Sequence, residues 1–117
     1  MTILTALEAD IYGPNNSRYI LDQNDNPISE PDLFKWGTWL QKTDRHVGND
    51  EIDGVRVSTI FVGLNLRYAA EGPPVLWETV IFGGKLNGYR VQYSSKEKAL
   101  SGHNEACEKV RQEKALH

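Results

Sequence analysis

The chain has 117 residues and a formal net charge of -3, with 39% hydrophobic and 25% charged residues. This length suits one domain with one core, and the composition is typical of a soluble globular protein rather than a disordered one. No apolar run approaches the roughly 20 residues that a helix needs to cross a bilayer, so we expect no membrane association.

The distribution of charge argues against a dedicated nucleic-acid binder. Residues 1–54 hold ten acids and four bases, whereas residues 55–117 hold six acids and nine bases. That excess of bases is too small for the basic surface that phosphate binding requires. A basic and aromatic cluster keeps nucleic-acid association as an alternative, and it comprises Tyr89, Arg90, Tyr93, Lys96 and Lys98.

Signals for compartment and metal binding are sparse. The start MTILTALEADIY lacks the basic region of a secretory signal, so we expect a cytoplasmic protein. Cys107 is the single cysteine, which excludes an intrachain disulfide and argues against a thiolate zinc site. The histidines at 46, 103 and 117 show no metal-ligand spacing, and we expect neither a metal nor a cofactor.

The first predicted elements are a small hairpin over 18–28 and a helix after it. RYILDQNDNPI places a short apolar strand before a cluster of Asp and Asn turn formers. In SEPDLFKWGTWLQK, Ser29 is the candidate N-cap of the helix. Leu33, Trp36 and Leu40 follow at i, i+3 and i+7 and predict its buried stripe.

Three strands are predicted next. The Asp-Gly pair at 53–54 favours a type I′ hairpin turn, after which a strand is expected over about 55–64. The run VLWETVIFGG predicts a second strand, and LNGYRVQY predicts a third. Together these signals predict a three-stranded antiparallel meander.

The last predicted element is a helix over KEKALSGHNEACEKVRQEK, with Ser94-Ser95 offering N-cap oxygens. Its apolar stripe should cover one face of the sheet and comprises Ala99, His103, Ala106 and Val110. Gly102 lies inside the helix, where only a close approach of another group would make it useful.

These elements predict an α+β fold in two layers, with an antiparallel meander of three to five strands packed with two helices. We expect a single domain over 1–117, with an irregular segment over 1–17 and a compact core over 18–113.

Several blocks resemble a family of small bacteriophage and prophage proteins that are described only as hypothetical. The most specific blocks are VSTIFVGLN and PPVLWETVIFGG, and the likeness covers roughly residues 18 to 106. The resemblance implies a phage or prophage origin and carries no activity. Where relatives read Asp-His after Gly-Leu, this chain has Asn65-Leu66, so the resemblance implies no metal or catalytic role there.

Glu78 is an acid in the middle of the apolar run PPVLWETVIFGG. Strand alternation places it on one face with Leu76 and Val80. A buried carboxylate must be paired, hydrogen-bonded or protonated. We predict a structural cross-strand pair with an arginine, the alternative being a functional carboxylate. The candidate bases are Arg45, Arg56, Arg90 and His103.

His103 lies in the buried stripe of the last helix. We interpret it as a core histidine whose ring nitrogens are hydrogen-bonded within the protein. The functional alternative couples His103 with Glu78 and a hydroxyl from Ser58 or Thr59, as in a small hydrolase. No nucleophile elbow, P-loop or metalloprotease motif accompanies these residues, so we expect no catalysis.

The function we predict is a non-catalytic accessory binding protein that acts by protein–protein contact. The resemblance implies that its target is a host or antiphage-defence component. Trp39, Tyr68 and Tyr89 are the candidate contact residues.

A second class of function is capture of a small ligand or nucleotide in a pocket around Trp77, Glu78 and Arg90. A homodimer formed through a free strand edge is a third alternative.

Overall fold

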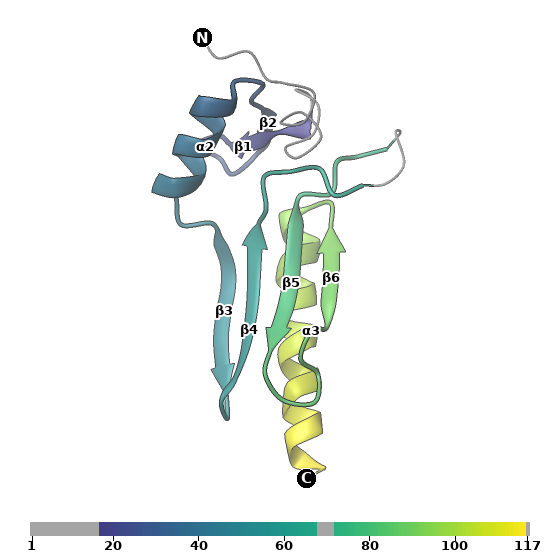
Figure 1. Cartoon of the computed structure of the whole chain (residues 1–117). Helices are drawn as coiled ribbons and strands as arrows, with labels where there is room; N and C mark the ends of the chain where they lie inside the picture. Colours follow the sequence, from purple (N-terminus) through teal and green to yellow (C-terminus); the bar gives the residue numbers. More distant parts are fainter. Residues whose placement is uncertain (1–16, 68–71, 117) are drawn as a thin grey trace.

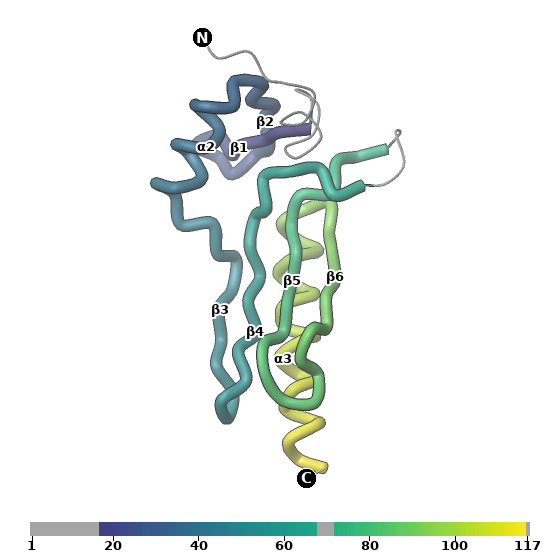
Figure 2. The backbone as a smooth tube through the Cα atoms, viewed as in Figure 1, coloured from purple at the N-terminus to yellow at the C-terminus, as the bar shows by residue number. Residues whose placement is uncertain are grey.

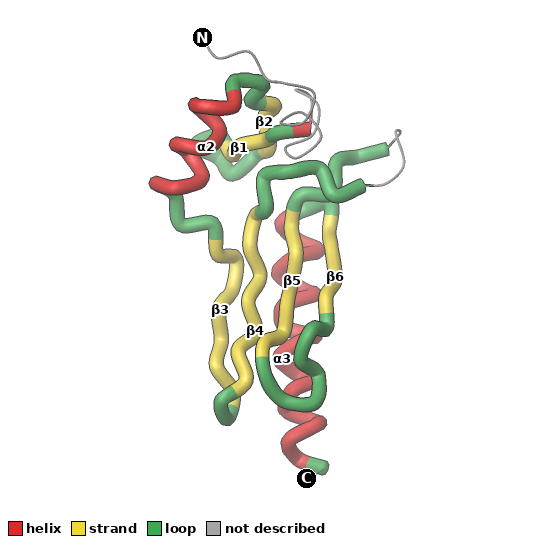
Figure 3. The backbone as a smooth tube through the Cα atoms, viewed as in Figure 1, coloured by secondary structure: helices red, strands yellow, loops and turns green. Residues whose placement is uncertain are grey.

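The computed structural model describes residues 17–67 and 72–116. The irregular segment expected over 1–17 lies outside these residues except for Ser17, and Tyr68 and His117 lie outside them as well. Within this part of the chain, two helices, a two-stranded sheet and a four-stranded sheet form the predicted α+β fold (Figures 1 and 3). None of the described helices is long and apolar enough to cross a bilayer.

The predicted small hairpin is confirmed as β1 (Tyr19–Leu21) paired antiparallel with β2 (Pro27–Ser29). Asp22 Oδ1 accepts hydrogen bonds from the backbone N–H groups of Asn24 at 2.8 Å and Asn26 at 2.9 Å. This Asx-type turn explains why the acidic and amide cluster ends the first strand.

The first helix, α2 (Leu33–Lys42), has Asp32 as its N-cap, so the predicted cap Ser29 is wrong. Ser29 pairs with Tyr19 as the last residue of β2, and its extended backbone ends three residues before the cap. Asp32 Oδ1 accepts from two backbone N–H groups of the first helical turn, at 2.9 and 3.0 Å. Trp36 is the buried member of the predicted stripe.

The large sheet has the antiparallel order β3-β4-β5-β6. It comprises β3 (His46–Ile52), β4 (Val55–Phe61), β5 (Trp77–Phe82) and β6 (Arg90–Tyr93). The predicted meander is confirmed as β4-β5-β6, and β3 adds an edge strand that was not predicted. The turn between β3 and β4 has φ of +48° at Asp53 and +82° at Gly54, as a type I′ turn requires. The strand expected to reach Leu64 ends at Phe61, because the chain turns at Gly63 with φ of +82°.

The last helix, α3 (Lys96–Ala115), is confirmed with Ser95 as its N-cap, whose side chain accepts from Lys98 N. It runs along one face of the sheet and contacts all four of its strands (Figure 2). The predicted stripe Ala99, His103, Ala106 and Val110 is buried, together with Gly102 and Cys107.

The core lies between α3 and the sheet in two clusters. One is built on Val55, Val57, Ile81, Ala106, Cys107 and Val110. The other is built on Phe61, Leu76, Trp77 and Ala99. The polar side chains buried between the same two layers are Thr59, Thr79 and His103.

Candidate functional site

Glu78 forms the cross-strand pair that the sequence predicted. Its Oε1 accepts a hydrogen bond from Arg90 at 2.7 Å, and its Oε2 accepts one from the Gln92 amide at 2.9 Å. Both donors come from β6, whose Gln92 is the register partner of Glu78. The carboxylate side chain is only 12% exposed, while that of Arg90 is 55% exposed. Glu78 is therefore satisfied by its sheet neighbours.

The proposed pocket around Trp77, Glu78 and Arg90 is not assembled. Trp77 is 2% exposed and packs its ring against Phe61 at a centroid distance of 5.2 Å, in the core cluster that includes Ala99 of α3. Glu78 follows Trp77 in β5, so strand alternation directs it to the opposite face. The tryptophan is a core residue, and only the two charged residues share the open face.

The predicted contact residues do not form one exposed patch either. Trp39 is half-buried and meets Phe61 edge to face at 5.7 Å. Tyr89 packs against the other core cluster, and Tyr68 lies outside the described residues. The aromatic side chains exposed among the described residues are instead Phe34, at 83%, and Phe82, at 43%.

His103 is coupled to Asp50 and Thr59, and not to Glu78. Its Nε2 lies 2.6 Å from Asp50 Oδ2, and its Nδ1 lies 2.8 Å from Thr59 Oγ1. The imidazole is 5% exposed, whereas the Asp50 side chain is 55% exposed at the edge of the sheet. The hydrogen bond from His103 holds the pKa of Asp50 below its ordinary value. Of the two hydroxyls considered from sequence, Thr59 is the partner.

A chain of hydroxyl groups extends from Thr59 into the core. Thr59 Oγ1 lies 2.5 Å from Thr79 Oγ1, which accepts from the Tyr93 hydroxyl at 3.1 Å. Since the ionised Asp50 can only accept, Nε2 of His103 donates to it, and a neutral imidazole then accepts at Nδ1. With this tautomer the hydroxyls donate in one direction, from Tyr93 through Thr79 and Thr59 to His103. Burial raises the pKa of the Tyr93 hydroxyl.

Two glycines make room for this network. A Cβ at Gly48 would lie 2.5 Å from His103 Nε2, so β3 runs against the imidazole without a side chain. A Cβ at Gly102 would overlap the Tyr93 hydroxyl and ring. Tyr93 is therefore the residue whose close approach to α3 requires a glycine at position 102.

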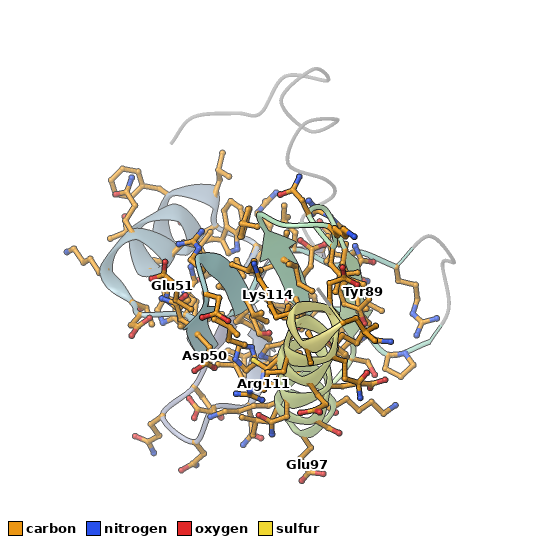
Figure 4. The ribbon with its side chains drawn as sticks, turned by 90° about the horizontal axis from the view of Figure 1, so that it is seen from below. Asp50, Glu51, Tyr89, Glu97, Arg111 and Lys114 are labelled. Atoms are coloured by element: carbon orange, nitrogen blue, oxygen red, sulfur yellow. The ribbon has the colours of Figure 1, made fainter. Side chains whose placement is uncertain are left out.

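Cys107 lies one helical turn after His103 and faces the same edge of the sheet. Its Sγ is 3.6 Å from His103 Nε2 and 3.7 Å from Asp50 Oδ2. Burial raises the pKa of the thiol, and the Asp50 charge raises it further. Figure 4 shows Asp50 and Glu51, which are neighbours in β3, on opposite sides of the sheet, with Asp50 on the side of α3.

The network resembles a catalytic triad only in its order of acid, imidazole and hydroxyl. A nucleophile must reach a substrate, yet Thr59 and Thr79 are both 0% exposed beneath α3. The group that faces solvent is the carboxylate of Asp50. The arrangement can hold a proton or a cation at the β3 edge, and it offers no described surface for acyl or phosphoryl transfer.

Asp50 is the member of this cluster that sequence reasoning missed. The sequence does contain a signal for Asp50. If the residues before the predicted turn at Asp53-Gly54 pair with the strand after it, Asp50 lies opposite Val57. Val57 belongs to the buried face of β4, so its partner must lie on the same side. Asn65, at which the sequence implied no catalytic role, accepts hydrogen bonds at its side-chain Oδ1 from the backbone N–H groups of Arg67 and Val75, at 3.0 Å each.

A separate cavity of about 150 Å³ lies at the far end of the sheet. Its lining includes Val55, Gly83, Gly84, Lys85, Leu86, Val110, Glu113 and Lys114.

Comparison with protein-family models, curated proteins and solved structures gives no match.

Proposed function

We propose that this chain is a non-catalytic binding protein that docks a protein partner on the open face of its four-stranded sheet. α3 covers one face, and Figure 1 shows no second described helix on the opposite face. The middle of the open face carries the partly exposed side chains of Ile60 and Val80, and Phe82 is 43% exposed. This apolar row is the observation that carries the proposal, because protein interfaces bury such surface at their centre.

The charges on the open face favour a protein over a nucleic acid. Arg90 is already paired with Glu78, and the Arg56 guanidinium lies 4.7 Å from the centre of the Phe82 ring. Arg56 also faces Glu51 across β3 and β4. Since each of these two arginines has an acidic neighbour, neither leaves an uncompensated positive charge on the described part of this face to neutralise phosphates. A neutral, apolar protein surface is the partner that fits.

Neither alternative gains comparable support. The cavity of about 150 Å³ is smaller than the roughly 300 Å³ at which ligand sites begin, so capture of a nucleotide is disfavoured. The hydrolase hypothesis joined Glu78 with His103, but these side chains lie on opposite faces of the sheet. A host or antiphage-defence target is the partner we propose, and it is supported by the resemblance of VSTIFVGLN and PPVLWETVIFGG to phage and prophage proteins.

The test compares two apolar residues of nearly equal exposure, one on the open face of the sheet and one on the helix that covers the other face. Phe82 on the open face is 43% exposed, and Leu100 on α3 is 44% exposed. Tagged wild type, Phe82→Ser and Leu100→Ser are used to capture proteins from host lysate, and each captured protein is quantified by mass spectrometry. We expect a stoichiometric partner that Phe82→Ser loses and Leu100→Ser retains.

Retention of the partner by Phe82→Ser would contradict docking on this face, and so would equal loss by both variants. Sedimentation of the purified chain adds a control for self-association. If the chain is a dimer that Phe82→Ser dissociates, the open face binds a second copy and the host-partner proposal is wrong.

A further inference from the structure

We infer that Asp50, His103 and Cys107 form a Zn²⁺ site that links the edge strand β3 to α3. The site lies on the side of the sheet opposite the docking face and does not depend on the function proposed above. Its three potential ligand atoms lie within 4.8 Å of one another. Carboxylate, imidazole and thiolate are all ligands that Zn²⁺ accepts.

The distances between the ligand atoms already approach those of a tetrahedral site. With Zn–S near 2.3 Å and Zn–N and Zn–O near 2.0 Å, sulfur should lie about 3.5 Å from each of the other two atoms. Cys107 Sγ lies 3.6 Å from His103 Nε2 and 3.7 Å from Asp50 Oδ2. The third distance, between His103 Nε2 and Asp50 Oδ2, is 2.6 Å, because these atoms share a hydrogen bond. This distance must increase to about 3.3 Å when a metal replaces the proton between them.

Thr59 supplies the outer support that a metal-binding imidazole needs. It lies 2.8 Å from Nδ1 and is fully buried, so it holds the ring with Nε2 directed at Asp50 and Cys107. Ligating histidines are usually fixed in this way through the other ring nitrogen. When Nε2 binds the metal, Nδ1 carries the proton and donates to Thr59, and the hydroxyl chain through Thr79 to Tyr93 reverses its direction.

A cation can reach the three ligand atoms from solvent, because one ligand lies at the protein surface. Asp50 is 55% exposed at the sheet edge, whereas His103 and Cys107 are buried on successive turns of α3. A cation therefore enters from the solvent side of Asp50, and a water molecule occupies the fourth position. Binding also requires the Cys107 thiol to release its proton to solvent, since thiolate is the ligand.

One neighbour opposes the cation. Arg111 lies one turn beyond Cys107, and its positive charge acts on both Asp50 and Cys107. Its side chain is 56% exposed and lies 3.7 Å from Glu108, so solvent and that acid reduce its effect. Arg111→Gln should therefore strengthen metal binding while leaving all three ligands in place.

The experiment is a Co²⁺ titration of the untagged, chelator-treated full chain, followed by competition with Zn²⁺. Co²⁺ is the probe because thiolate coordination gives a near-ultraviolet charge-transfer band and a four-coordinate site gives intense visible bands. Cys107 is the only cysteine, so that band reports on this residue alone. We expect one Co²⁺ per chain, displacement by Zn²⁺, and a higher melting temperature with Zn²⁺.

Matched variants separate this site from surface binding. Cys107→Ser should abolish the charge-transfer band. Asp50→Asn should weaken metal binding at least tenfold, and the fold should tolerate this change because the Asp50 side chain is exposed. Thr59→Val should weaken binding about 10- to 100-fold while Thr59→Ser restores it. Glu51→Gln and His46→Gln are the controls and should bind as the wild type does. Circular dichroism of each metal-free variant checks that it is folded.

Three results would overturn the inference. The first is absence of a charge-transfer band in the wild type at millimolar Co²⁺. The second is a stoichiometry of one Co²⁺ per two chains, which would place Cys107 in an intermolecular site. The third is binding that survives Asp50→Asn and Cys107→Ser but is lost in His46→Gln, which would identify an adventitious surface site beside Asp44.

Discussion

Asp50 on the edge strand β3 and His103 on α3 are joined by a 2.6 Å hydrogen bond, across 53 residues of sequence. The pair connects the two layers at the point where the sheet ends, because β3 has no neighbour beyond it among the described strands. The buried imidazole thus presents one nitrogen to the sheet edge and the other to the core hydroxyls.

Asp50→Ala should lower the free energy of unfolding by about 1 kcal/mol at neutral pH, the size of one net hydrogen bond at a partly exposed position. Glu51→Ala is the matched control, since Glu51 is the next residue of β3 on the opposite face and should change stability by less than about 0.5 kcal/mol. Urea unfolding of both chelator-treated variants measures the difference. Equal effects would show that the Asp50–His103 bond adds nothing to stability.

The same substitution at two helical glycines should have opposite effects. Gly102→Ala places a methyl group into Tyr93 and should destabilise the protein by about 1–3 kcal/mol. Gly37→Ala in α2 meets no atom within 4 Å and should stabilise it by up to about 1 kcal/mol, as alanine is the better helix former. Thermal unfolding of both variants tests this, and a stabilised Gly102→Ala protein would mean that α3 and β6 lie further apart.

Tyr93 should make stability fall in alkaline solution. Burial raises the pKa of its hydroxyl in the folded protein above the ordinary value of 10.0. The folded state therefore keeps the neutral form while the unfolded chain ionises, so the stabilisation is complete below pH 10 and is lost as pH rises through the folded pKa. Unfolding at about pH 9 and about pH 11 should show a larger loss for the wild type than for Tyr93→Phe. Equal losses would contradict this assignment.

The Glu78–Arg90 pair should contribute modestly to stability. Arg90 is 55% exposed, so a double-mutant cycle with Glu78→Gln and Arg90→Gln should give a coupling of about 0.5–1 kcal/mol. The control is Arg56→Gln, which removes a cation of the same face that Glu78 does not contact and should show no coupling. A coupling above about 3 kcal/mol would instead indicate a desolvated pair.

Local patterns predicted most elements of this fold. The turn formers at 53–54, the alternation in β4 and β5, and the Ser95 cap with its apolar stripe each act within a few residues, so sequence carries their signal directly. Sequence missed the edge strand β3, because an exposed strand needs neither a continuous apolar run nor strict alternation. It misplaced the cap of α2, because two acceptors, Ser29 and Asp32, precede the same helix.

Local sequence patterns were therefore enough to predict the α+β class, the meander, both helices and the pairing of Glu78 with an arginine. The groups that surround His103 could be identified only from the tertiary contacts. A helix face specifies what is buried, but the partners of a buried imidazole come from other elements, here β3 and β4. Their identity depends on strand register and on the gap that Gly48 leaves, and a shift of one residue would have replaced Asp50 by Glu51 or Asn49.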